Sequence, residues 1–125
     1  MSPDILKFII DQRTAKFTRS VWFYGEEIDV YLRAGEYHLN LETKQYQFAL
    51  GISNVNKKPD AAKGSFKKLI TALECYGKEL GYDVLRVEEV RNRTLFQGLR
   101  KHGYVLRPGT DLDPTLVREL QTVNY

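Results

Sequence analysis

The spacing of apolar residues changes in the middle of this chain. Between residues 20 and 55, aromatic and β-branched residues alternate with polar ones, whereas residues 64–80 repeat their apolar positions about every 3.6 residues. A period of two is typical of strands that bury one face, and a period near 3.6 is typical of an amphipathic helix. The sequence therefore predicts an antiparallel meander, followed by a half in which helices and strands alternate.

The first half is predicted to contain one helix and four strands. The helix begins at Pro3, because proline is favoured in the first turn of a helix. Its apolar stripe consists of Ile5, Phe8, Ile9 and Phe17. Short turns, one of them at Ala34-Gly35, separate four alternating segments. The strands are expected at residues 21–24, 28–32, 37–41 and 46–52.

The second half is predicted to contain three helices and two strands. Asn92 is a preferred N-cap, and glycine is the preferred residue just after a helix. Helices are expected from Gly64 to Gly81, from Asn92 to Gly103 and from Pro114 onward, and strands at residues 84–87 and 104–106. The predicted fold class is α/β (α+β mixed sheet), in which the antiparallel meander continues into a βαβ-like half.

The composition favours one folded domain over residues 1–125. Hydrophobic residues at 42% and charged residues at 28% are ordinary for a globular protein and argue against disorder. Cys75 is the only cysteine, so an internal disulfide cannot form, which points to a reducing compartment. The apolar stretch at residues 5–10 is too short and too interrupted for a signal peptide or a membrane span. A cytoplasmic location without a membrane partner is therefore expected.

The segment before the longest predicted helix has features of a phosphate-binding loop. Its glycine, Gly64, opens directly into the helix, whose first backbone N–H groups and positive dipole end attract anions. Five lysines surround it: Lys57, Lys58, Lys63, Lys67 and Lys68. A solvated lysine-rich loop would have the same composition. The sequence alone therefore leaves a phosphate site and an ordinary charged surface as alternatives.

Residues 64–104 resemble the central region of the GNAT superfamily of N-acetyltransferases. Leu80-Gly81-Tyr82 is similar to the end of the long helix in that family. The family segment "N-x-x-A-x-x-L-Y-x-K-x-G-F" is matched at Asn92, Lys101, Gly103 and Tyr104. The resemblance implies the acyl-CoA N-acyltransferase fold, and acetyl-CoA as co-substrate. The implied acceptor is an amine, on either a small molecule or a protein.

The resemblance also implies roles for particular residues. Those that would bind CoA, at its pantetheine arm or its pyrophosphate, are Ile52, Asn54, Val55, Lys63, Gly64, Ser65 and Asn92. The base that deprotonates the amine would be Glu88 or Glu89, at the end of a predicted strand. An ordinary exposed glutamate is the alternative for either. No metal is expected, because neither His38 nor His102 has a metal-ligand partner at suitable spacing.

The sequence departs from the family pattern at several positions. Ala61 and Phe66 replace a polar and a small residue of the pyrophosphate loop. Leu99 stands where the family often has a tyrosine that protonates the departing thiolate, and leucine cannot donate a proton. One helix replaces the usual pair near the N-terminus, and little chain remains for the usual last hairpin. These departures affect the expected catalysis more than the expected fold.

They support a second interpretation, in which the chain is a catalytically inactive relative, encoded by a phage or a mobile element. It would then bind a protein or a nucleic acid, or have a structural role. Nucleic acid is not the favoured partner, because a net charge of +3 is ordinary for a soluble protein. The alternating aromatic residues are also more typical of cross-strand pairs than of base stacking. Both a monomer and a homodimer are compatible with the sequence.

Overall fold

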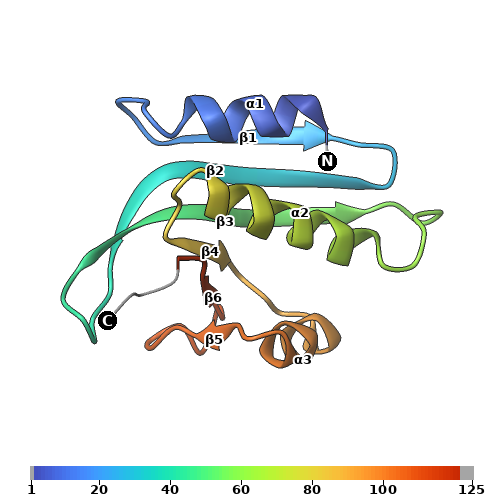
Figure 1. Cartoon of the computed structure of the whole chain (residues 1–125). Helices are drawn as coiled ribbons and strands as arrows, with labels where there is room; N and C mark the ends of the chain where they lie inside the picture. Colours follow the sequence, from blue (N-terminus) through green and yellow to red (C-terminus); the bar gives the residue numbers. More distant parts are fainter. Residues whose placement is uncertain (1, 122–125) are drawn as a thin grey trace.

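The computed structural model describes residues 2–121 and forms one layer of sheet with helices packed on it (Figure 1). The helices are α1 (Pro3–Asp11), α2 (Ser65–Glu79) and α3 (Arg93–Lys101). The strands are β1 (Arg19–Tyr24), β2 (Ile28–Leu39), β3 (Tyr46–Lys57), β4 (Val84–Val87), β5 (Val105–Leu106) and β6 (Leu116–Glu119). They form a single sheet in the order β1-β2-β3-β4-β6-β5. The pair β3 and β4 is parallel and the other pairs are antiparallel, so the predicted mixed sheet is confirmed.

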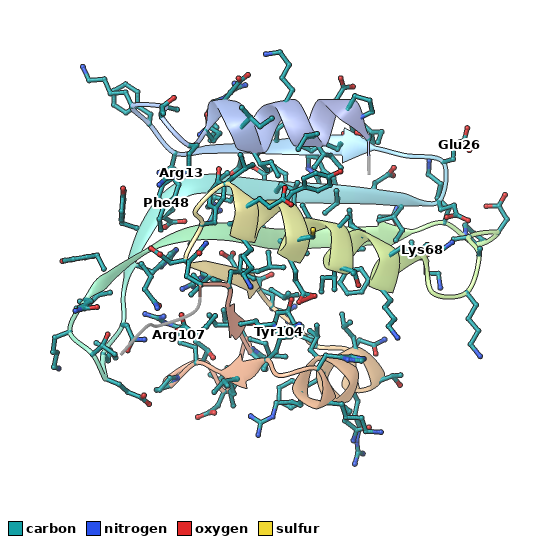
Figure 2. The ribbon with its side chains drawn as sticks, in the orientation of Figure 1. Arg13, Glu26, Phe48, Lys68, Tyr104 and Arg107 are labelled. Atoms are coloured by element: carbon teal, nitrogen blue, oxygen red, sulfur yellow. The ribbon has the colours of Figure 1, made fainter. Side chains whose placement is uncertain are left out.

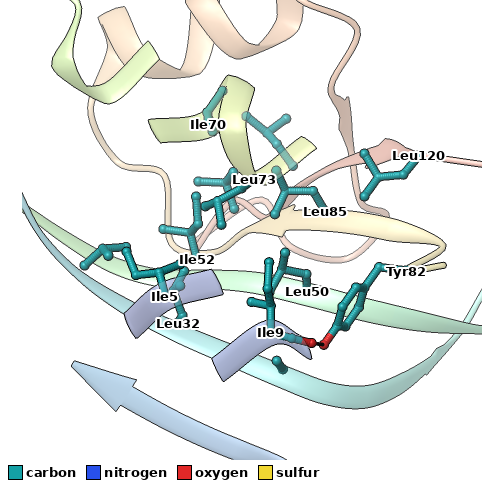
Figure 3. Close-up of a cluster of buried hydrophobic side chains, with 14 of the residues drawn as sticks. Ile5, Ile9, Leu32, Leu50, Ile52, Ile70, Leu73, Tyr82, Leu85 and Leu120 are labelled. Carbon is teal, nitrogen blue, oxygen red and sulfur yellow. Dashed lines mark hydrogen bonds between the residues drawn. The ribbon is translucent and has the colours of Figure 1, made fainter. Parts of the chain in front are cut away.

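The hydrophobic core lies between the sheet and the helices α1 and α2 (Figure 3). Leu32 of β2 and Leu50 and Ile52 of β3 point toward these helices and are almost completely shielded from solvent. Ile9 of α1 and Leu73 of α2 belong to the same cluster. Burial of one such side chain stabilises the fold by about 1.5–3 kcal/mol. This packing therefore holds α2 firmly against β3, the strand that precedes it.

Tyr82 connects α1 to the turn after α2. Its ring is buried and stacks on Phe48, with the ring centroids 4.8 Å apart. Its hydroxyl donates a hydrogen bond of 2.7 Å to the carbonyl oxygen of Ile9 (Figure 3). Burial raises the pKa of Tyr82 to about 12. The hydroxyl therefore stays protonated well above neutral pH, and the hydrogen bond to Ile9 is kept there.

The predicted turn at Ala34-Gly35 is wrong, because β2 continues through these residues. The register of β2 against β3 shifts between Ala34 and Glu36, which marks a β-bulge. Gly35 adopts a φ of +94°, a conformation that glycine reaches without steric cost. The buried side chain of Gln12 donates a hydrogen bond of 2.9 Å to the carbonyl oxygen of Ala34 and stabilises the bulge. The two strands expected on either side of the turn are therefore one.

Two further predictions are wrong. Phe17 does not belong to the opening helix, because α1 ends at Asp11 and Phe17 is 74% exposed. The last helix, expected from Pro114, is instead strand β6, which pairs with β4 and with β5. Its apolar run is too short for periodicity to distinguish a helix from a strand. The β5–β6 pair also shows that the chain is long enough for a last hairpin.

The other elements lie close to their predicted positions. α2 begins directly after Gly64, and Gly81 follows its end with a φ of +83°. α3 begins directly after Asn92, as predicted. β4 has the predicted bounds, and the strand expected at residues 104–106 is β5. Within residues 2–121, no helix is both long and apolar enough to cross a membrane.

The contact between Tyr82 and Ile9 leads to the first prediction. Tyr82→Phe should lower the free energy of unfolding by about 1–2 kcal/mol, because the buried carbonyl group of Ile9 loses its donor. Tyr46→Phe is the control, since Tyr46 is exposed and its change should be within about 0.5 kcal/mol. Urea unfolding monitored by circular dichroism measures both. Equal stabilities for the two variants would contradict the connecting role of Tyr82.

Candidate functional site

β3 and β4 separate partway along the sheet. Their parallel pairing ends at Ile52 and Val87, and the backbone N–H of Glu88 donates the next hydrogen bond, 2.9 Å long, to the carbonyl oxygen of Ile52. β3 nevertheless continues to Lys57, and it remains paired with β2 over that length. Residues 53–57 of β3 therefore have no strand partner on the β4 side within the described chain. Backbone groups at such a free edge must find partners elsewhere.

Two local irregularities cause this separation. A register shift between β2 and β3 leaves Ser53 unpaired, because Leu32 faces Ile52 while Tyr31 faces Asn54. A bulge of this kind bends the strand that contains it. On the other strand, Glu89 adopts a φ of +52°, which is uncommon for a residue other than glycine. β4 thus ends in a sharp turn while β3 continues, and we call the loss of strand pairing beyond Ile52 the gap between β3 and β4.

The free edge of β3 lies beside the starts of two helices. β3 and β4 are parallel, so their carboxyl ends lie at the same side of the sheet. α2 follows β3 and α3 follows β4, and both helices therefore begin at that side (Figure 1). In open α/β sheets, ligands bind at the carboxyl ends of the strands.

The predicted cofactor-binding residues are distributed along this side of the sheet. The side chain of Ile52 belongs to the core and its carbonyl already accepts from Glu88, so Ile52 has little left to offer a ligand. The side chain of Val55 packs against the core, so only its backbone groups can face a ligand. Asn54 is exposed on the free edge. Lys63, Gly64 and Ser65 form the entry to α2.

The turn between β1 and β2 holds the loop that leads to α2. The backbone N–H of Lys58 donates to the carbonyl oxygen of Glu27 at 2.8 Å, and that of Ala62 donates to the Glu27 carboxylate at 3.0 Å. The ammonium group of Lys58 bonds to the carbonyl oxygen of Gly25 and lies 3.5 Å from the Asp29 carboxylate. The ammonium group of Lys58 is therefore paired within the protein and is not free to bind a ligand. Figure 2 shows this end of the molecule, with Glu26 of the turn and Lys68 of α2.

Among the described residues, no side chain caps the N-terminus of α2, and the Glu27 carboxylate bonds to Ala62, in the loop before the helix. Gly64 is the N-cap, with a φ of +86°, and the first turn contains no acidic residue. Lys63 and Lys67 are exposed beside it. The hydroxyl of Ser65 is buried and has no hydrogen-bond partner among the described residues. These features suit an anionic group. Phe66 packs against the core instead of blocking this space.

The structure distinguishes the two candidate bases. The Glu88 carboxylate accepts a hydrogen bond of 3.3 Å from the Ser53 hydroxyl and lies 3.6 Å from the guanidinium group of Arg33. Its side chain is 18% exposed. Glu89 is exposed to solvent, in the sharp turn that ends β4. Glu88 therefore lies at the gap, and Ser53 and Arg33 hold it there. Nothing in the sequence marked these two partners, because the bulge brings Ser53 to Glu88.

Asn92 caps α3. Its side-chain oxygen accepts a hydrogen bond of 2.9 Å from the backbone N–H of Leu95. Leu99, at the position where the family pattern often has a tyrosine, belongs to the hydrophobic core. Tyr104 is also buried, and burial raises its pKa, which makes its hydroxyl a poor proton source. Within residues 2–121, no group of three or more metal-ligating side chains is placed to hold a metal ion.

Comparison with known proteins supports the fold but goes no further. No family model and no curated protein matches the sequence. A solved structure of a "putative acetyltransferase" from Agrobacterium tumefaciens aligns with a TM-score of 0.53 at 8% identity, over 94% of this chain and 86% of that chain. Nourseothricin acetyltransferase aligns with a TM-score of 0.47 at 11% identity, over 97% of this chain and 96% of that one. The acetyltransferase-like mixed α/β fold expected from the sequence is thereby confirmed.

The cap on α3 can be tested separately from any role in binding. Asn92→Ala should lower the free energy of unfolding by about 1 kcal/mol, because the Leu95 N–H loses its acceptor. Asn92→Asp keeps an oxygen at that position and should retain most of the stability. Chemical unfolding of both variants measures the difference. Stability of Asn92→Ala equal to that of the natural chain would contradict the capping role.

Proposed function

We propose that this chain is an acetyl-CoA-dependent N-acetyltransferase that acts on an amine. The observation that carries the proposal is the end of pairing between β3 and β4, which lies on the same side of the sheet as the uncapped N-terminus of α2. One side of this gap offers unpaired backbone groups and the other offers a positive helix end. CoA has amide groups along its pantetheine arm and phosphates at its other end, so the two kinds of partner match the two parts of the molecule.

The proposed cofactor-binding residues have distinct tasks. The backbone of β3 at Asn54 and Val55, beyond the last paired residue Ile52, would pair with the pantetheine arm. The first backbone N–H groups of α2, at Gly64 and Ser65, would bind the pyrophosphate. Lys63 would add positive charge at the same place, because it is exposed and next to the helix start. The buried Ser65 hydroxyl, which has no partner among the described residues, provides one more donor. Asn92 would approach the arm from α3.

Glu88 is the proposed base in the transfer step. It accepts a proton from the acceptor amine, directly or through a water molecule. The amine nitrogen then forms a bond to the acetyl carbonyl carbon while the bond between that carbon and sulfur breaks. The products are an N-acetylated amine and CoA, whose thiolate takes up a proton. The proton comes from solvent in this scheme, because the Leu99 side chain has no acidic proton and Tyr104 is buried.

Binding of CoA is the first test. CoA at about 100 times its dissociation constant should raise the free energy of unfolding by about 2.7 kcal/mol. Thermal unfolding, followed by the fluorescence of Trp22, measures this. Lys63→Glu should weaken CoA binding about tenfold, which corresponds to about 1.4 kcal/mol. Lys78→Glu is the matched control, because Lys78 is exposed about 20 Å away along α2 and its charge is screened at that distance.

Two outcomes would contradict the proposed site for CoA. One is the absence of any shift in unfolding temperature at millimolar CoA. The other is an equal loss of affinity in the two lysine variants, which would indicate general attraction to a positive protein and not a site at the start of α2.

The role of Glu88 is tested by its amide. Glu88→Gln should lower kcat about 10²- to 10³-fold, because glutamine cannot accept the proton. Its affinity for CoA should stay within about twofold of the natural chain. Glu89→Gln is the control, since Glu89 is exposed outside the gap. Release of free thiol from acetyl-CoA, measured over a panel of primary amines, gives both rates. Equal rates for Glu88→Gln and Glu89→Gln would remove Glu88 from the mechanism.

A further inference from the structure

The sheet face opposite α1 and α2 contains a cluster of charged side chains around a small hollow, which is closed even to a water molecule in this conformation. It is lined on β2 by Arg33, Glu36 and His38, on β4 by Arg86, directly after β4 by Glu88, and on β3 by Ala49 and Gly51. The register places Gly51 between Arg33 and Arg86. Ala49 and Gly51 have small side chains or none, so β3 does not fill the space between the charged side chains of β2 and those at the end of β4. We call these seven residues the charged trough.

Arg86 is the unusual member of the charged trough. It is only 8% exposed, and its Nε and Nη1 atoms have no hydrogen-bond partner among the described residues. No carboxylate within residues 2–121 lies within 4.0 Å of it as an ion pair. Burial lowers the pKa of Arg86, and the positive charge of Arg107 lowers it further. A buried guanidinium group without an anion is unfavourable for folding, so such a group is normally paired.

The two glutamates of the charged trough are already engaged by other groups. Glu36 lies 3.2 Å from the imidazole of His38 and 3.8 Å from Arg33. Glu88 accepts from Ser53 and lies near Arg33. Burial and Arg86 lower the pKa of His38, which is therefore neutral at pH 7. With Arg107 nearby, three arginines face two glutamates, and one positive charge is left over.

We propose that the charged trough binds the carboxylate of an amino-acid-type acceptor, with Arg86 as the partner of that carboxylate. This inference rests on the proposed function, because it places the amine of the same acceptor at Glu88. Arg86 on β4 and Glu88, directly after that strand, are two residues apart in sequence and line the same face of the sheet, with backbones about 6.6 Å apart. A positive and a negative group at that spacing complement a molecule whose carboxylate and amine are a few bonds apart.

The carboxylate has a route to Arg86. Arg33 and Glu36 are the most exposed charged members of the charged trough, with about a third of each side chain accessible. Their mutual contact at 3.8 Å is long, and exposed contacts of this kind contribute little to stability. To admit the ligand, the two side chains must move apart, and Arg33 must also give up the 3.0 Å hydrogen bond that its Nε donates to the Ser20 hydroxyl. Arginine is well suited to bind it, because its planar group pairs with a carboxylate through two parallel hydrogen bonds.

The stability of an Arg86 variant tests the inference without any enzyme assay. Arg86→Met keeps a long side chain and removes the buried charge. Without ligand, this variant should unfold at the same temperature as the natural chain or at a higher one, because the charge has no partner to lose. If Arg86 instead had a structural role, Arg86→Met would unfold at a clearly lower temperature, and the inference would be overturned.

Acceptor preference gives the second readout. Tyrosine and tyramine differ only in a carboxylate, and so do lysine and cadaverine. The natural chain should acetylate the carboxylate-bearing member of at least one pair with a kcat/KM at least tenfold higher. Arg86→Met should reduce that preference at least tenfold. Arg100→Met is the matched control, because Arg100 is exposed on α3, and it should keep the full preference. Equal kcat/KM values within both pairs for the natural chain would overturn the inference.

A binding measurement separates this inference from the proposed function. N-acetyltyrosine and N-acetyltyramine need no acetyl transfer, so their effect on thermal unfolding can be measured even if no amine is acetylated. A rise in unfolding temperature with N-acetyltyrosine that is lost in Arg86→Met would support the carboxylate site. This result does not depend on whether the chain binds CoA. Equal shifts with both compounds, or none with either, would overturn the carboxylate site and leave the test with CoA unaffected.

Discussion

The strand β3 has neighbours of unequal length, and the candidate site depends on this inequality. Its pairing with β2 continues to Lys57, whereas its pairing with β4 stops at Ile52. A strand edge freed inside a sheet must satisfy its backbone groups with something other than a strand. Because β3 and β4 are parallel, the freed edge lies next to the starts of α2 and α3. The bulge at Ser53 that helps to open the gap also brings a hydroxyl to Glu88, so one irregularity both shapes the site and positions its proposed base.

The two faces of the sheet serve different purposes. On one face, apolar side chains of β2, β3 and β4 pack under α1 and α2 and supply the stability of the fold. On the other face, the charged trough contains a buried arginine that contributes unfavourably to that stability. Natural proteins tend to concentrate such local conflicts at functional sites, where other contacts offset them. The charged trough and the gap meet at Glu88, which faces both.

The sequence predicted those features that depend on local chemistry. Asn92, Gly64 and Gly81 marked the ends of helices because caps are set by neighbouring residues. The bulge at Gly35 was mistaken for a turn, since a glycine between two apolar runs is expected in both, and the side chain of Gln12 that stabilises it is distant in sequence. At the site, the family resemblance suggests Gly64 for binding and Glu88 or Glu89 as the base, and these roles stay predictions. The burial of Arg86 could not be predicted, because it depends on which strands become neighbours.

The loop before α2 is held in shape by a turn on the other side of β2. Glu27 and Gly25 in that turn bind the loop at Lys58 and Ala62, so the loop is ordered when the chain folds. A ligand that meets an ordered loop loses less conformational entropy on binding than one that must order the loop itself. The affinity of the loop for an anion therefore depends partly on residues that do not contact the anion. The same few hydrogen bonds therefore stabilise the fold and fix the shape of the binding loop. A change in the β1–β2 turn should affect anion binding as a change in the loop itself would.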